Sequence, residues 1–84
     1  MRPMAVRVLF FATYADLLGL AQTELTLAAP TTVAGLLELL RQRLPGAEGL
    51  PARPMVAVNQ RHVSLDSPVV DSDEVAFLPP LAGG

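Results

Sequence analysis

Cysteine and lysine are both absent from this sequence of 84 residues. Without cysteine, the chain has no disulfide bond, no thiolate metal site, no cysteine nucleophile and no persulfide on which to carry sulfur. Any covalent chemistry must therefore use another group, and we expect no metal site.

The sequence also lacks a concentration of positive charge. Its net charge is −2, and the six basic residues, all arginine, are scattered along the chain. Domains that bind nucleic acids carry a basic patch. We therefore expect no nucleic acid partner.

Long apolar runs are absent too. No run approaches the ~20 residues that would cross a bilayer. Near the start, Arg7 places a charge where the apolar segment of a secretory signal would have to lie. We therefore expect a cytoplasmic protein with no membrane partner.

What the sequence does contain is a succession of short strand and helix patterns. A chain of this length forms one small domain. Strands are predicted where β-branched and aromatic residues alternate, and helices where apolar residues recur three and four apart. The expected strands are 5–11, 22–27, 55–58, 61–65 and 74–78, with a short helix at 13–18 ended by Gly19 and a loop at 46–54.

The clearest helix follows Pro30. Thr31 or Thr32 can cap its start, and Pro45-Gly46 ends it. Gly35 inside the first turn costs up to ~1 kcal/mol relative to alanine, which is tolerable if the backbone packs closely there. An apolar stripe that should cover one face of a sheet is formed by Val33, Leu36, Leu37, Leu40 and Leu44.

The order of these elements predicts an α+β fold of the β-grasp, or ubiquitin-like, type. The right-handed crossover rule favours a first and a last strand that lie parallel at the centre of the sheet. We expect a mixed sheet of about five strands packed on one main helix within residues 1–78, followed by a flexible C-terminal tail at 79–84.

The sequence ends Pro79-Pro80-Leu81-Ala82-Gly83-Gly84. A free α-carboxyl is an anion at neutral pH and must be activated, for example by adenylation, before it can accept a nucleophile. Glycine lacks a Cβ and can thread a narrow channel, while the two prolines end the preceding strand and favour an extended chain. The alternative is that the two glycines are only a frayed terminus.

The ending is the most specific part of a wider match. Asp73-Glu74-Val75-Ala76-Phe77 leads into Pro79-Pro80 and Gly83-Gly84, and further matches lie at 8–12, 32–33, 57–60 and 63–64. In these stretches the sequence resembles the small subunit of molybdopterin synthase, a family of ubiquitin-like sulfur carriers.

This resemblance implies a sulfur-transfer cycle on Gly84. Gly83, which has no side chain, would allow the terminus to enter the partner's narrow channel. A ubiquitin-activating-like adenylyltransferase would use ATP to activate Gly84, and a sulfur donor would convert the adenylate into a thiocarboxylate. The tail would then enter the large synthase subunit, in a heterotetramer of two small and two large subunits, and donate sulfur to cyclic pyranopterin monophosphate to form molybdopterin. The large subunit would supply the catalytic residues, so that this chain is no enzyme alone and binds no cofactor.

The face of the sheet opposite the helix is expected to be a partner surface. It carries Leu9, Phe11, Ala76 and Leu78, which the chain has too few elements to cover. The resemblance implies that the large subunit is contacted by Phe11, His62, Leu78, Pro79, Pro80, Leu81 and Ala82. The alternatives are scattered surface apolar residues or the opposite strand parity.

Two positions depart from the family pattern. His62 stands where an apolar residue is common, and we interpret it as a surface or interface residue rather than a catalytic one. Ser72 stands where the family often has glycine, and we expect a type I turn there, which accepts serine. Close by, Asp71, Asp73 and Glu74 are interpreted as a solvated turn rather than a cation site, or as a contact for basic residues of the adenylating enzyme.

Two other functions remain open from the sequence. One is a different β-grasp carrier that serves tRNA thiolation, thiamine biosynthesis or protein conjugation, although thiamine-type carriers are usually shorter and lack the Phe77-Leu78-Pro79-Pro80 approach. The other is a non-covalent binding module whose tail is inert.

Overall fold

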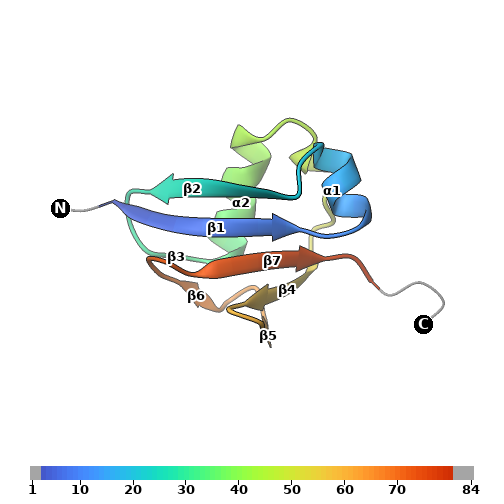
Figure 1. The fold of residues 1–84 in the computed structure, drawn as a ribbon. Coiled ribbons are helices and arrows are strands. Elements are labelled where there is room, and N and C mark those ends of the chain that lie inside the picture. The colour runs from blue at the N-terminus through green and yellow to red at the C-terminus, as the bar shows by residue number, and fades with distance from the viewer. Residues whose placement is uncertain (1–2, 81–84) are drawn as a thin grey trace.

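The computed structural model describes residues 3–80, which form a mixed sheet with helices on one face (Figure 1). The sheet has five strands in the order β2-β1-β7-β4-β5, and a separate pair joins β3 to β6. The elements are β1 Met4–Phe10, α1 Thr13–Leu18, β2 Gln22–Leu27, β3 Thr31–Thr32, α2 Val33–Arg43, the 3₁₀ helix η1 Ala47–Gly49, β4 Met55–Val58, β5 Arg61–Val63, β6 Pro68–Val69 and β7 Glu74–Leu78.

The topology confirms the β-grasp prediction. The first and last strands, β1 and β7, pair in parallel at the centre of the sheet, and β2, β4 and β5 pair antiparallel to their neighbours. The chain crosses from β2, at one edge of the sheet, to β4, on the far side of β7, through α2, which lies across one face (Figure 1). None of the helices within residues 3–80 has the length and apolarity that a membrane crossing requires.

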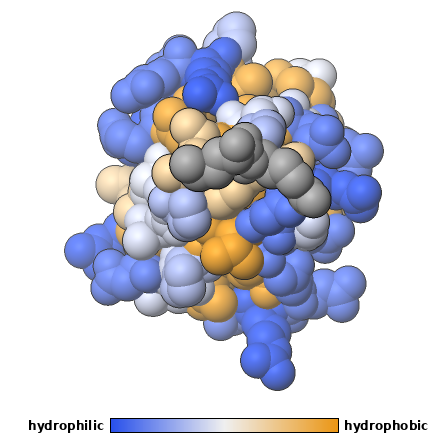
Figure 2. Space-filling view, turned by 90° about the vertical axis from the view of Figure 1, so that its left-hand side faces the viewer, coloured by the Kyte–Doolittle hydropathy of each residue, from blue (hydrophilic) through white to orange (hydrophobic). Residues whose placement is uncertain are grey.

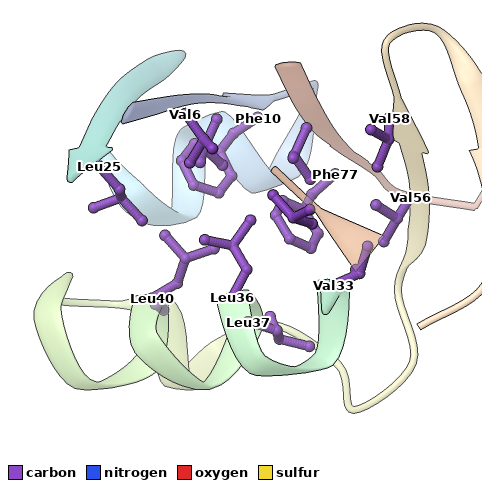
Figure 3. Close-up of a cluster of buried hydrophobic side chains, with 14 of the residues drawn as sticks. Val6, Phe10, Leu25, Val33, Leu36, Leu37, Leu40, Val56, Val58 and Phe77 are labelled. Carbon is purple, nitrogen blue, oxygen red and sulfur yellow. The ribbon is translucent and has the colours of Figure 1, made fainter. Parts of the chain in front are cut away.

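The core lies between the sheet and α2, as Figure 3 shows. Alternation along β1 turns Val6, Val8 and Phe10 toward the helix, and each is at most 2% exposed. The parallel register places Phe10 opposite Phe77, and their rings stack with centroids 6.0 Å apart. The predicted parity of both central strands is therefore confirmed.

Helix α2 begins as the sequence predicted. Thr32 is its N-cap, and its side-chain oxygen accepts a hydrogen bond from the Gly35 N–H at 3.1 Å. Val33, Leu36, Leu37 and Leu40 are buried, whereas Leu44 follows the helix as its C-cap and is half-buried. A Cβ on Gly35 would overlap Thr31 Oγ1, which is the close approach that explains a glycine in the first turn.

Tight turns at the ends of the strands use left-handed backbone conformations. Asn59 and Gln60 both have positive φ and form the two-residue loop of the β4–β5 hairpin, in which Val58 pairs with Arg61. The type I turn expected at Ser72 is wrong, because Ser72 has φ 72°. The turn is held in that conformation by the Ser72 N–H, which donates to Ala5 O at 2.8 Å.

Three local features differ from the sequence-based expectation. The pair β3–β6 and the helix η1 were not predicted, since elements of two or three residues carry too little periodicity. Strand β5 ends at Val63 rather than Leu65, because the Ser67 N–H donates to Ser64 O and begins a turn. The spacing of Tyr14, Leu17 and Leu18 predicts an apolar stripe on α1, of which Tyr14 is buried, whereas Leu17 is 44% exposed beside Gly49.

Candidate functional site

The face of the sheet opposite α2 presents side chains in cross-strand rows. In the middle row, Leu9 of β1, Ala76 of β7, Ala57 of β4 and His62 of β5 are direct neighbours. Nearer the C-terminal end of β7, Leu78 pairs with Met55. We call this side of the sheet the open face.

An apolar hollow of about 520 Å³ lies at the end of the open face where β1 and β7 finish. Two of its large side chains are well exposed, Phe11 at 45% and Met55 at 43%. Its lining consists of Phe11, Ala12, Thr13, Met55, His62, Leu78, Pro79 and Pro80. We refer to it as the apolar hollow.

The apolar hollow brings together five residues that the sequence singled out: Phe11, His62, Leu78, Pro79 and Pro80. Pro79 and Pro80 directly follow β7, so the hollow adjoins the point from which the last residues of the chain continue. The other predicted site residues, Leu81, Ala82, Gly83 and Gly84, lie outside the described residues.

Three further residues that line the apolar hollow were not predicted from the sequence. Met55 had a usable signal, because alternation along β4 puts Met55 and Ala57 on the face opposite Val56 and Val58. Ala12 and Thr13 had none, since their place on the hollow depends on how the chain turns after β1.

That turn is made by an unusual backbone conformation at Ala12. Ala12 has φ 50° and ψ −124°, values close to those of the first central residue of a type II′ turn, where glycine is preferred. A non-glycine residue in such a region costs about 1–3 kcal/mol. The Tyr14 N–H closes the turn by donating to Phe11 O at 3.0 Å.

The lining of the apolar hollow is mostly apolar. Thr13 and His62 are the polar side chains in it, and the other lining residues are Phe11, Ala12, Met55, Leu78, Pro79 and Pro80.

The other end of the open face is polar. A second hollow, also of about 520 Å³, is lined there by Ala5, Val6, Arg7, Glu24, Asn59, Gln60, Ser72 and Glu74. Arg7 lies between its cross-strand neighbours Glu24 and Glu74, with Nη1 3.7 Å from Glu74 Oε2. Figure 2 looks onto the end of the molecule where β1 begins, where hydrophilic residues surround a central hydrophobic area.

The acidic turn before β7 is more structured than a solvated turn. Asp73 Oδ1 accepts from Asn59 Nδ2 and Asp73 Oδ2 from the Val70 N–H, both at 2.9 Å. Asp71 Oδ1 accepts from the Ala5 N–H at 2.9 Å. Within residues 3–80 there is no group of three or more acidic or histidine side chains arranged to hold a metal ion. These carboxylates fasten β7 to its neighbours.

Comparison with known proteins identifies similar chains along nearly the whole length. The model of the ThiS family matches residues 8–84. The molybdopterin synthase sulfur carrier subunit of Escherichia coli is 40% identical, over 94% of this chain and 99% of its own length.

Solved structures agree on the fold. A putative molybdopterin converting factor subunit 1 from Pyrococcus furiosus superposes with a TM-score of 0.77 at 28% identity, covering 93% of this chain and 99% of its own. A chain in the complex of subunits 1 and 2 of molybdopterin-converting factor from Helicobacter pylori superposes with a TM-score of 0.69 at 23% identity, covering 96% of this chain and 100% of its own.

Proposed function

Because the chain belongs to the ThiS family, we infer that it is the sulfur carrier subunit of a molybdopterin synthase. The observation that carries this inference within the molecule is the position of the apolar hollow, which adjoins Pro79-Pro80. A partner that docks on the hollow receives the end of the chain beside its own active site.

The reactive group is the α-carboxylate of Gly84. An adenylyltransferase joins this carboxylate to the α-phosphate of ATP and releases pyrophosphate, which gives the acyl carbon a good leaving group. A sulfur donor then attacks that carbon, the new C–S bond replaces the C–O bond to phosphate, and AMP departs. ATP belongs to the partner, and this chain binds no cofactor.

The last four residues have the length that entry into a partner's active site requires, and the last two have no side chain. Four extended residues, Leu81 to Gly84, span roughly 13–14 Å at about 3.3–3.6 Å per residue. Gly83 and Gly84 carry no Cβ that would obstruct a narrow channel. The folded domain therefore stays outside while the thiocarboxylate reaches the substrate.

The partner that consumes the sulfur is the large subunit of molybdopterin synthase, in a heterotetramer of two small and two large subunits. It supplies the catalytic residues and the pocket for cyclic pyranopterin monophosphate. The small subunit supplies the sulfur and an apolar docking surface, formed by Phe11, His62, Leu78, Pro79 and Pro80 with Met55 beside them.

The carrier function is tested by the intact mass of the chain after incubation with the adenylyltransferase, ATP and sulfide. We expect the mass to rise by the replacement of one oxygen by sulfur, and to stay constant when ATP is omitted. A chain that lacks Gly84 is the matched control and should not change. If the full-length chain keeps its mass while the adenylyltransferase thiolates an established carrier in parallel, the proposed function is wrong.

A further inference from the structure

We propose that Ala12 is a positioning residue for docking, because its backbone conformation fixes the direction in which Phe11 stands at the rim of the apolar hollow. The proposal rests on the proposed function, since it names a determinant of the same docking surface. Ala12 would act through Phe11 and not by a contact of its own.

The conformation of Ala12 is unlike the other left-handed ones in the described chain. Asn59, Gln60 and Ser72 also have positive φ, but each is a polar residue in a turn near the polar end of the sheet. Ala12 is apolar, and among the four it alone lines the apolar hollow. Strained backbone that the surrounding structure holds in place tends to occur at functional sites.

Backbone hydrogen bonds hold the turn at Ala12 from both sides. Before it, the Phe11 N–H donates to Phe77 O at 3.3 Å and ties Phe11 to β7. After it, Tyr14, which is buried, donates its N–H to Phe11 O, and the Ala15 N–H donates to Ala12 O at 3.0 Å. Helix α1 has no side-chain hydrogen bond at its N-cap, so the change of direction between β1 and α1 is held at Ala12 by these backbone hydrogen bonds.

This arrangement presents an aromatic ring to solvent on a fixed backbone. Phe11 is 45% exposed, although the next residue toward the N-terminus, Phe10, is buried in the core. Ordering a side chain at an interface weakens binding, and an anchor that is already ordered avoids that loss. Glycine at position 12 would remove the strain, but it would leave the turn between β1 and α1 free to adopt other conformations.

The test is the affinity of the chain for the large synthase subunit, measured by calorimetry for the wild type, Ala12→Gly, Phe11→Ala and the double variant. We expect Ala12→Gly to bind about 2- to 10-fold more weakly, the range that corresponds to ordering one side chain on docking. Its melting temperature should equal that of the wild type or lie a few degrees higher. In the Phe11→Ala background, Ala12→Gly should have no further effect on affinity.

Ser72→Gly provides the matched control. It replaces another non-glycine residue of positive φ, at the polar end of the sheet, and should leave the affinity unchanged without lowering the melting temperature. Equal affinity of Ala12→Gly and wild type would overturn the proposal, and so would an equal loss in the Phe11→Ala background. If the wild type itself does not bind the large subunit, the proposed function fails first, and this inference with it.

Discussion

The two faces of the sheet carry apolar side chains from the same strands, but α2 covers only one of them. On the covered face Val8, Val75 and Phe77 are fully buried, whereas on the open face Phe11 and Met55 remain more than two-fifths exposed. Within residues 3–80 there is one long helix, α2, and it buries one side of the sheet. Strand parity therefore decides which apolar residues of the sheet are buried under α2 and which remain on the open face.

The largest expected effect on stability comes from replacing a phenylalanine by alanine, and it should differ between the two faces of the sheet. Phe77→Ala should lower the free energy of unfolding by about 3–5 kcal/mol, because it removes a ring with no exposed surface that stacks on Phe10. Phe11→Ala should lower it by less than about 1 kcal/mol, since its ring is already partly in water. Urea unfolding measures both, and similar losses would mean that the open face is part of the core.

The next largest effect is a loss of binding to the large subunit without unfolding of the domain. Leu78→Asp places a charge in the lining of the apolar hollow and should weaken binding to the large subunit by about 2–4 kcal/mol, as expected when a charge replaces a central apolar contact. The matched change is Gln22→Asp, which adds a charge to the same face outside the hollow and should leave the affinity nearly unchanged. Unaltered affinity of Leu78→Asp would contradict the docking role of the hollow.

The covered face was predictable because its pattern is long and regular. Alternation in β1 and β7 and the stripe on α2 each repeat over several residues, and every repeat points to the same core. The shortest elements, β3 and β6, were missed because two-residue strands depend on tertiary packing rather than on local pattern.

The open face was only half predictable. Parity alone turns Phe11 and Leu78 toward the same side, but the hollow between them also needs the pairing of Leu78 with Met55 and the turn at Ala12. Strand pairing is set by contacts distant in sequence. A positive φ at alanine leaves no mark on the side-chain pattern, and Ser72 was misjudged for the same reason.

A smaller effect is expected at the polar end of the sheet, where a substitution should lower stability without changing the affinity for the large subunit. Asp73→Ala removes the acceptors for Asn59 Nδ2 and the Val70 N–H, and it should lower the free energy of unfolding by about 1–2 kcal/mol. Its affinity for the large subunit should not change, because Asp73 does not line the apolar hollow. Asp66→Ala, at an exposed carboxylate before β6, should be nearly neutral in thermal unfolding. Weaker docking of Asp73→Ala would extend the partner surface to the polar end.

The smallest effect on stability is expected for Arg7→Ala, and the adjacent residue Val8, which points to the other face of the sheet, provides the comparison. Arg7 has a side chain that is 59% exposed and contacts Glu74 at 3.7 Å, so Arg7→Ala should change the free energy of unfolding by less than about 0.5 kcal/mol. Added salt should reduce even that difference, because exposed ion pairs are screened. Val8→Ala, one residue further on, should cost about 2 kcal/mol whatever the salt concentration, since Val8 is fully buried. A cost at Arg7 that matches the cost at Val8 would show that the ion pair with Glu74 holds the sheet together, and that the open face contributes to stability as well as to association.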